Sequence, residues 1–289
     1  MDRLKRLAAR AKLQVEKARA RWGAVDIVVR TFKRYSEDDG GTYSAALTYF
    51  MFFSIFPLLL FAAAVLGYIV SDADQQQRLV TSGLNTVPIL KDALTPEGLK
   101  VIQANRNNLA ITGGVLALYS GSGVIVALQH ALNKINHITD EPNFWQKKLR
   151  SIVWLAILGI GAIASLALSG IAGFAPGPLA FILGLAGGLA VNTALFATAF
   201  RVLPGKDFTW GEVLPGSIVA AVGFEILKIG GAWYLARGET ARNDTFGTFA
   251  AAAALLIASY LVAQVILLSA EVNAVLAERR VTRQSSGST

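Results

Sequence analysis

Long stretches without any charged residue constrain this chain more than any other feature of its sequence. Four intervals, 40–71, 107–133, 151–200 and 245–270, contain no Asp, Glu, Lys or Arg over 32, 27, 50 and 26 residues. A helix needs about 20 apolar residues to cross a bilayer. The interval of 50 residues would form a helix of about 75 Å, so it must fold back, and the Gly- and Pro-rich run at 173–178 is the predicted turn.

The segment 213–235 adds a further span, apolar except for Glu225 and Lys228. Only 16% of the residues are charged, against about 25% in soluble proteins, so lipid must cover much of the surface. The apolar runs are continuous rather than alternating, which favours helices over a membrane barrel. We therefore predict an all-α membrane protein, a bundle of six transmembrane helices. The predicted spans are 44–70, 109–131, 151–172, 179–200, 213–235 and 246–270.

The distribution of Lys and Arg predicts how the bundle is oriented. Twenty of these residues belong to the side that carries both termini, and six belong to the other side. The positive-inside rule therefore places both termini in the cytoplasm. The net charge of +8 is explained by topology, and we expect no nucleic-acid partner. The chain has no cysteine, which excludes disulfides and thiolate chemistry.

The predicted spans divide the chain into three parts. Residues 1–42 form a basic cytoplasmic arm, residues 43–276 form the transmembrane domain, and residues 277–289 form a cytoplasmic tail. Within the domain, the loop 71–108 is the only sizeable segment on the outer, periplasmic side. Its pattern predicts short helices, which would form a small cap over the bundle.

Apolar residues recur every three or four positions through residues 4–32 of the arm, with Lys and Arg on the other faces. This pattern predicts an amphipathic helix. Such a helix can lie in the cytoplasmic interface of the membrane, with its basic side chains on anionic lipid headgroups. Packing against its own bundle, or against a second subunit, explains the pattern equally well.

Glu225 and Lys228 are the sharpest candidates for a functional site. They lie near the middle of the fifth span and share one helix face, because they are three positions apart. A charge at the bilayer centre costs about 2.5–3.5 kcal/mol, so the two must pair or face a wet cavity. One interpretation is a substrate or ion site, and the other is a structural ion pair.

The second span carries polar residues near its cytoplasmic end. His130, Asn133 and His137 have the spacing of one helix face. A zinc site needs at least three good ligands, and these residues do not supply them, so we predict no metal site. The small residues of Tyr119 to Gly123 predict either close helix packing or a local break that lines a cavity, and we favour close packing.

Other spans contain single residues of interest. Pro57 is predicted to bend the first span, and the glycine pair at 184–188 predicts close packing in the fourth. Glu271 and Asn273 close the sixth span on the cytoplasmic side. Glu271 is expected to pair with a loop base such as Arg201 or to reach water.

Four segments resemble, in order, the signatures of one known family. They are AALTYFMFFSIFPLLLF at 45–61, ALNKI at 131–135, FRVLPGKDFTWGEVLPGSIVAAVGFEILK at 200–228 and FGTFAAAAALLIASYLVAQVILLSAEVNAVL at 246–276. The chain thereby resembles the YihY family, also called virulence factor BrkB, over roughly residues 40–280. It departs from the family pattern where Phe replaces the usual Tyr at 246 and where Ser replaces the usual Gly at 269.

The resemblance implies a six-span protein of the bacterial inner membrane, with no cofactor. An old label calls some members ribonucleases, but this sequence has no acidic metal cluster and no soluble domain to support that activity. Family associations with the cell envelope and with lipid or lipopolysaccharide imply movement of an amphiphile. The matched positions carried over are Pro57, Asn133, Leu203, Pro204, Glu225, Lys228, Gly247, Glu271 and Asn273.

Three functions follow from these observations. The first is a transporter or translocase for a lipid or anionic amphiphile, with Glu225 and Lys228 on the pathway and Asn133, Glu271 and Asn273 as polar support. The second is a scaffold that recruits envelope machinery and moves nothing. A membrane-bound hydrolase or nuclease ranks last, so we expect no enzyme. The expected partners are membrane lipids, and small-residue faces permit a homo-oligomer.

Overall fold

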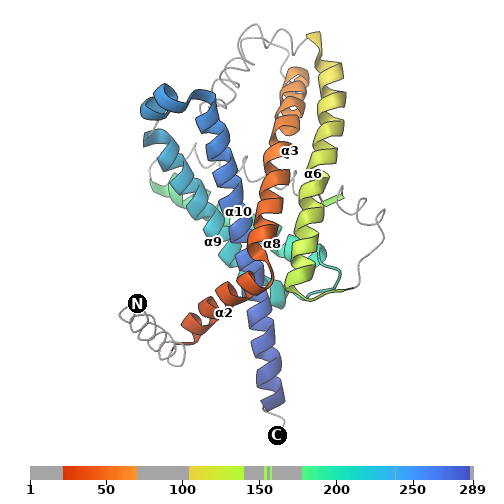
Figure 1. The fold of residues 1–289 in the computed structure, drawn as a ribbon, viewed down its shortest axis with the longest axis vertical. Helices are drawn as coiled ribbons and strands as arrows, with labels where there is room; N and C mark the ends of the chain where they lie inside the picture. Colours follow the sequence, from red (N-terminus) through yellow and green to blue (C-terminus); the bar gives the residue numbers. More distant parts are fainter. Residues whose placement is uncertain are drawn as a thin grey trace, which may run out of the picture.

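The structure is a computed structural model. It describes residues 22–69, 104–139, 153–154, 157, 178–237 and 239–286. Six helices make up these residues (Figure 1): α2 (Gly23–Glu37), α3 (Gly40–Ile69), α6 (Arg106–Ile135), α8 (Pro178–Val202), α9 (Trp210–Arg237) and α10 (Glu239–Ser286). None of the described residues forms a strand.

Five of these helices, α3, α6, α8, α9 and α10, are long and apolar enough to cross a membrane. The prediction of an all-helical, multi-span membrane protein is therefore confirmed, and five of the six predicted spans correspond to these helices. The span at 151–172 lies almost entirely outside the described residues. Residues 1–21 of the arm and most of the loop 71–108 lie outside them too, so the count of six and the cap remain predictions.

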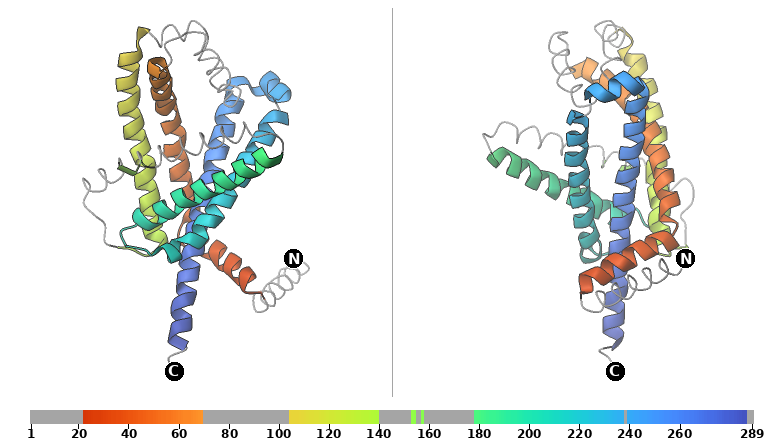
Figure 2. Two further views of the ribbon diagram at one scale, coloured as in Figure 1. Left: turned by 180° about the vertical axis from the view of Figure 1, so that it is seen from behind. Right: turned by 60° about the vertical axis from the view of Figure 1, so that its left-hand side comes forward.

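The spanning helices form two pairs around a central helix. Helix α3 packs along α6, α8 packs along α9, and α10 contacts α9, α3, α2 and α6 (Figure 1). Helix α8 crosses the others obliquely, as Figure 2 shows. Helix α2, the end of α6, the end of α8 and the start of α9 gather at one end of the bundle (Figure 2). We call this the α2 end.

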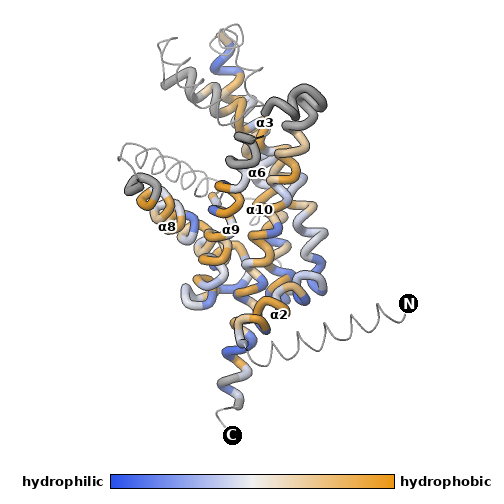
Figure 3. Tube along the Cα trace, turned by 90° about the vertical axis from the view of Figure 1, so that its left-hand side faces the viewer, coloured by the Kyte–Doolittle hydropathy of each residue, from blue (hydrophilic) through white to orange (hydrophobic). Residues whose placement is uncertain are grey.

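Helix α10 is much longer than a bilayer requires. Its 48 residues correspond to about 72 Å of helix at 1.5 Å per residue, although its first turns bend across the end of the bundle opposite α2 (Figure 1). A bilayer core is about 30 Å thick. The helix continues without a break beyond residue 270, where the sixth span was predicted to end. Its last turns project past α2 and carry many hydrophilic residues (Figure 3).

Small residues allow α3 and α6 to approach closely. A Cβ atom on Gly123 would lie 2.5 Å from the ring of Phe50, and one on Gly113 would lie 3.0 Å from the backbone nitrogen of Phe61. The hydroxyl of Ser122 donates to a carbonyl of its own helix, and α6 is continuous through this region. The close packing predicted for the small residues of the second span is therefore confirmed.

Candidate functional site

Glu225 and Lys228 form an ion pair, which is one of the two arrangements predicted for them. The Nζ atom of Lys228 lies 2.9 Å from each carboxylate oxygen of Glu225. At 1.5 Å per residue, Glu225 lies about 22 Å from the start of α9 and about 18 Å from its end, and Lys228 lies one turn further along the helix. The pair therefore belongs to the middle of a helix that is apolar enough to span a membrane.

Helix α8 supplies the other half of this cluster. The side-chain amide of Asn192 donates to Oε1 of Glu225 over 2.8 Å. One turn earlier, a Cβ atom on Gly188 would lie only 2.8 Å from the same oxygen, so this glycine lets the α8 backbone approach the carboxylate. Asn192 was not among the residues predicted for the site. The sequence does mark this residue, because it is a lone amide side chain in an apolar run. It also lies four positions after Gly188 and therefore on the same face of the helix.

The two charged groups of this cluster differ in exposure. The side chain of Glu225 is 7% exposed, and that of Lys228 is 42% exposed. An ammonium group has three donors and no acceptor. The cluster therefore buries its negative charge between α8 and α9 and presents its positive charge on the surface of the described helices, where an anion could bind.

A second polar cluster lies at the α2 end and is centred on Arg34. Its Nε donates to Oε2 of Glu271 over 3.1 Å, and its Nη2 donates to the backbone oxygen of Ile135 over 2.8 Å. Its Nη1 donates to the carboxylate of Glu278. One guanidinium group thus ties α2 to the end of α6 and to two turns of α10.

Burial lowers the pKa of the Arg34 guanidinium, whereas the hydrogen bond to Glu271 and the negative charge of Glu271 raise it. Together with Glu278 and with Asp38, whose carboxylate lies 3.7 Å from Nη2, they raise the pKa of the Arg34 guanidinium above its ordinary value. The group therefore remains charged at any pH at which the protein is folded.

The expected partner of Glu271 was wrong. Glu271 is fully buried and pairs with Arg34 of α2 rather than with Arg201 or water. Arg201 is engaged elsewhere, because its Nε donates to the backbone oxygen of Phe208 over 3.0 Å. Its guanidinium also lies 4.4 Å from the ring centre of Trp210, a cation–π contact. Arg201 thus holds the loop between α8 and α9.

Asn133 and Asn273 also lie at the α2 end, where they bind backbone groups of other elements. Oδ1 of Asn133 accepts from the N–H of Gly205 over 2.9 Å. Oδ1 of Asn273 accepts from the N–H of Gly216 over 2.6 Å, and its Nδ2 donates to the oxygen of Val213 over 3.0 Å. These amides join α6 to the loop and α10 to α9. The five predicted site residues therefore separate into two groups.

The end of α6 alters the predicted row of His130, Asn133 and His137. The helix ends at Ile135, and His137 follows with a φ of 51°. The N–H groups of His137 and Ile138 bond back to Lys134 and Asn133, the Schellman pattern that closes a helix. His137 therefore leaves the shared face, and its Nε2 lies 3.4 Å from Nη2 of Arg34. Within the described ranges, no three His, Asp or Glu side chains gather as metal ligands would.

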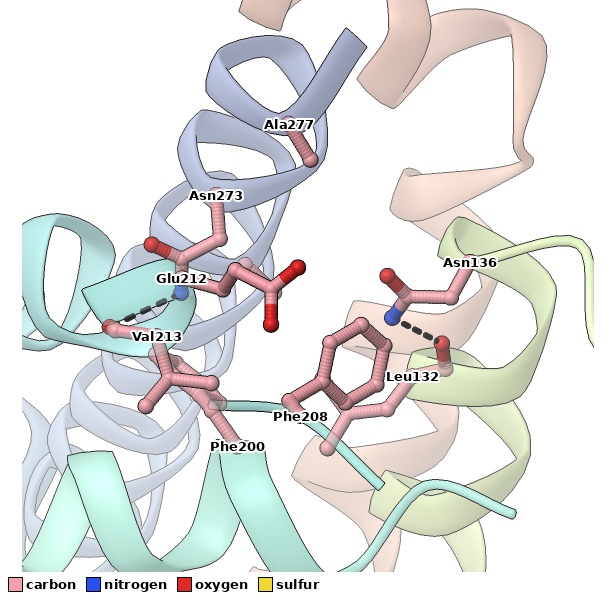
Figure 4. A pocket seen from close by; sticks show the side chains of 9 residues that line it. Leu132, Asn136, Phe200, Phe208, Glu212, Val213, Asn273 and Ala277 are labelled. Carbon is pink, nitrogen blue, oxygen red and sulfur yellow. Dashed lines mark hydrogen bonds between the residues drawn. The ribbon is translucent and has the colours of Figure 1, made fainter. Parts of the chain in front are cut away.

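A small pocket opens between α6, the loop and α10 (Figure 4). It is lined by Leu132, Asn136, Phe200, Phe208, Glu212, Val213, Ala270, Asn273 and Ala277. Its volume of about 20 Å³ suffices for one water molecule. The carboxylate of Glu212 accepts from the N–H and the hydroxyl of Thr209 over 2.8 and 2.7 Å, so it caps the start of α9. The pocket is too small for a lipid headgroup.

Comparisons with known proteins relate the chain to bacterial membrane proteins. The model of the family described as Virulence factor BrkB matches residues 31–289. Inner membrane protein YhjD of Escherichia coli is 27% identical over 226 residues, which cover 70% of this chain and 67% of that protein. YfkH of Bacillus subtilis, named as ribonuclease-like, is 26% identical over 269 residues, or 86% of this chain and 94% of that protein.

Some relatives are longer than this chain. A UPF0761 membrane protein of Methylibium petroleiphilum is 28% identical over 271 residues, which cover 88% of this chain but 62% of that protein. No solved structure matches the chain. The two polar clusters must therefore be interpreted from their own geometry.

Proposed function

Since the chain belongs to the virulence factor BrkB family of membrane proteins, we propose that it moves a lipid or another anionic amphiphile across the membrane. The observation that carries this proposal is the ion pair of Glu225 and Lys228 near the middle of α9, together with Asn192 of α8, which donates to Glu225. Ionisable groups at this depth are costly, and they commonly mark substrate or ion pathways.

In this proposal Lys228 binds the anionic headgroup. Its ammonium is the exposed member of the cluster and is held in place by Glu225. The headgroup competes with Glu225 for the ammonium, so that Lys228 exchanges one anion for another and the Glu225 carboxylate is left with its hydrogen bond from Asn192. Asn192 keeps its hydrogen bond to Glu225 and stabilises the carboxylate during the exchange.

The proposal places the α2 end in the cytoplasm of a bacterium, with the bundle in the inner membrane. The excess of Lys and Arg on that side of the chain supports this orientation. The sequence contains no phosphate-binding loop. Movement would therefore be passive, coupled to an ion gradient, or driven by a partner.

The proposal can be tested in proteoliposomes with fluorescently labelled anionic lipids and an impermeant reductant that reports their transfer between leaflets. We expect the wild type to move lipid and Lys228→Met to lose that movement. Ile229→Ala is the matched control, because it alters an exposed apolar side chain on the next position of the same helix. A folded Lys228→Met variant that moves lipid at the wild-type rate would contradict the proposal, as would a wild type that moves none.

A purely structural role for the cluster makes a different prediction. If Glu225 only fastens α9 to α8, then Glu225→Gln lowers the unfolding temperature, and lipid movement falls only in proportion to the folded fraction. Under our proposal Glu225→Gln alters the rate of movement in protein that remains fully folded. Measuring both quantities on the same preparation separates the two roles.

The scaffold function remains a second candidate because of the projecting end of α10. This segment extends past α2 (Figure 1) and leaves Val281 largely exposed, which offers a surface to a partner. The scaffold predicts that truncation after residue 280 abolishes function in cells while Lys228→Met is tolerated. The transporter predicts the opposite ranking.

A further inference from the structure

Helix α2 carries two opposite rows of side chains. Val28, Phe32 and Tyr35 follow each other by four and three positions and form an apolar row. Asp26, Arg30, Lys33 and Glu37 form a charged row about half a turn away. Within the charged row, Arg30 lies 2.8 Å from Asp26 and Lys33 lies 3.5 Å from Glu37, so its charges are paired along the helix.

The contacts of α2 fix where each row points. The hydroxyl of Tyr35, in the apolar row, lies 2.9 Å from that of Ser44, which is near the start of the spanning helix α3. Asp26, in the charged row, pairs with Arg279, on the part of α10 that leads out of the bundle. The apolar row therefore faces the spanning helices, and the charged row faces the projecting end of α10.

A short turn makes this orientation rigid. Asp39 has a φ of 56°, and a Cβ atom on Gly40 would lie 2.4 Å from the ring of Tyr35, so only glycine fits there. The bonds of Arg34 to Ile135 and Glu271 clamp a third side of α2 onto the bundle. Helix α2 can therefore neither roll about its axis nor swing away without breaking these contacts.

Two members of the apolar row are left without cover by the described helices. Phe32 is 59% exposed and Val28 is 54% exposed, while the side chains of Lys33 and Glu37 are 71% and 60% exposed. Contact with water is unfavourable for the apolar side chains of Phe32 and Val28 and favourable for the charged side chains of Lys33 and Glu37. Their arrangement matches the acyl and aqueous sides of a bilayer interface.

We propose that α2 lies in the interface of the same bilayer that the bundle spans, with Val28 and Phe32 in the acyl boundary and with Lys33 and Glu37 in the aqueous phase. Trp22, exposed at the start of α2, lies at headgroup depth, as interfacial Trp residues do. Because α2 is attached to the bundle, its position in the interface fixes the depth of the bundle in the membrane. This inference does not depend on lipid movement.

The absence of cysteine allows a direct test. Single variants Val28→Cys, Phe32→Cys, Lys33→Cys and Glu37→Cys, each carrying a nitroxide label, are reconstituted in vesicles that contain anionic phospholipid. Relaxation by lipid-soluble oxygen and by a water-soluble nickel complex is then compared. We expect oxygen to dominate severalfold at 28 and 32, and nickel to dominate at 33 and 37. The four positions are matched in exposure, so the membrane alone separates them.

Two outcomes would overturn the inference. Equal access of nickel to all four positions would place α2 in water. Low access of both reagents at 28 and 32 would show that protein, from this chain or from a second copy, covers the apolar row. Repeating the measurement at a tenfold lower protein-to-lipid ratio identifies a second copy, because dilution would then restore access.

Discussion

The ion pair of Arg34 with Glu271 and that of Lys228 with Glu225 each bury a carboxylate, but they obtain the cation differently. Arg34 comes from 237 positions away and is 13% exposed. Lys228 comes from the next turn of the same helix and is 42% exposed. A cation from a distant element joins parts of the fold, whereas a cation from the next turn joins none and stays accessible. The first pair therefore supports the architecture, and the second leaves its cation partly exposed on the surface of the described helices.

The largest effect should follow from removing the distant cation. Arg34→Ala leaves Glu271 buried without its partner, which typically costs about 3–5 kcal/mol. Thermal or denaturant unfolding in detergent would measure the loss. Arg30→Ala is the control, because that arginine is half exposed and pairs with Asp26 of the same helix. Combining Arg34→Ala with Glu271→Gln should recover part of the stability, and equal losses for the two arginine variants would refute the distinction.

A smaller but clear loss is expected from Gly216→Ala, where α9 crosses α10. The added Cβ atom would lie 2.2 Å from the backbone oxygen of Ser269. Since a backbone carbonyl cannot rotate aside, the helices must separate, at a cost of about 1–3 kcal/mol. Gly211→Ala is the matched control on the same helix, because nothing lies within 4 Å of its Cβ position. A Gly211→Ala variant that lost as much stability would contradict this account.

The corresponding change at the second pair should matter less for stability. In Gly188→Ala the new Cβ atom would lie 2.8 Å from Oε1 of Glu225, the end of a side chain that can move. The lost hydrogen bond from Asn192 to the charged carboxylate costs about 1.5–3 kcal/mol, and the gain in helix propensity offsets about 1 kcal/mol of this cost. We expect a net loss of stability smaller than that of Gly216→Ala, together with an altered rate of lipid movement. A loss as large as that of Gly216→Ala would make the cluster architectural.

The smallest stability effect should come from the double variant Glu225→Gln/Lys228→Met, which removes both charges and leaves no buried carboxylate without its cation. Replacing both partners of a buried ion pair by neutral groups of similar size changes stability little. The unfolding midpoint should therefore change little while lipid movement is lost, which is the sharpest form of the comparison. Equilibrium unfolding and the transfer assay on one preparation would check it. A large loss of stability here would place both ion pairs in the same class.

Local spacing in the sequence predicted what lies along one helix. Continuous apolar runs predicted α3, α6, α8, α9 and α10, and a spacing of three predicted that Glu225 and Lys228 share one helix face. Asn192 was missed because its partner belongs to another helix and no periodicity reports that contact. The position of Glu225 and Lys228 near the middle of α9 could thus be predicted from the sequence, but the hydrogen bond from Asn192 that attaches them to α8 could not.

The α2 end could not be predicted from spacing. Glu271 was assigned to Arg201, which is near the same end of the bundle, although its partner proved to be Arg34. The turn at Asp39, which folds α2 back against α10, decides that pairing. His137 left its predicted helix face because α6 closes at Ile135. Both errors arise where the chain reverses direction, at Asp39 and at His137. Each of these residues has a left-handed backbone conformation, which changes the direction of the chain that follows.

The long separation between Arg34 and Glu271 also has a consequence for synthesis. At about 5–20 residues per second, a ribosome needs about 10–50 s to make the 237 positions between them. During that interval α3, α6, α8 and α9 can enter the membrane, while Arg34 has Asp38 and the backbone oxygen of Ile135 beside it but no carboxylate of α10. The synthesis of α10 thus completes the attachment of α2, and a chain released before α10 lacks the carboxylates of Glu271 and Glu278 that Arg34 binds in the finished fold.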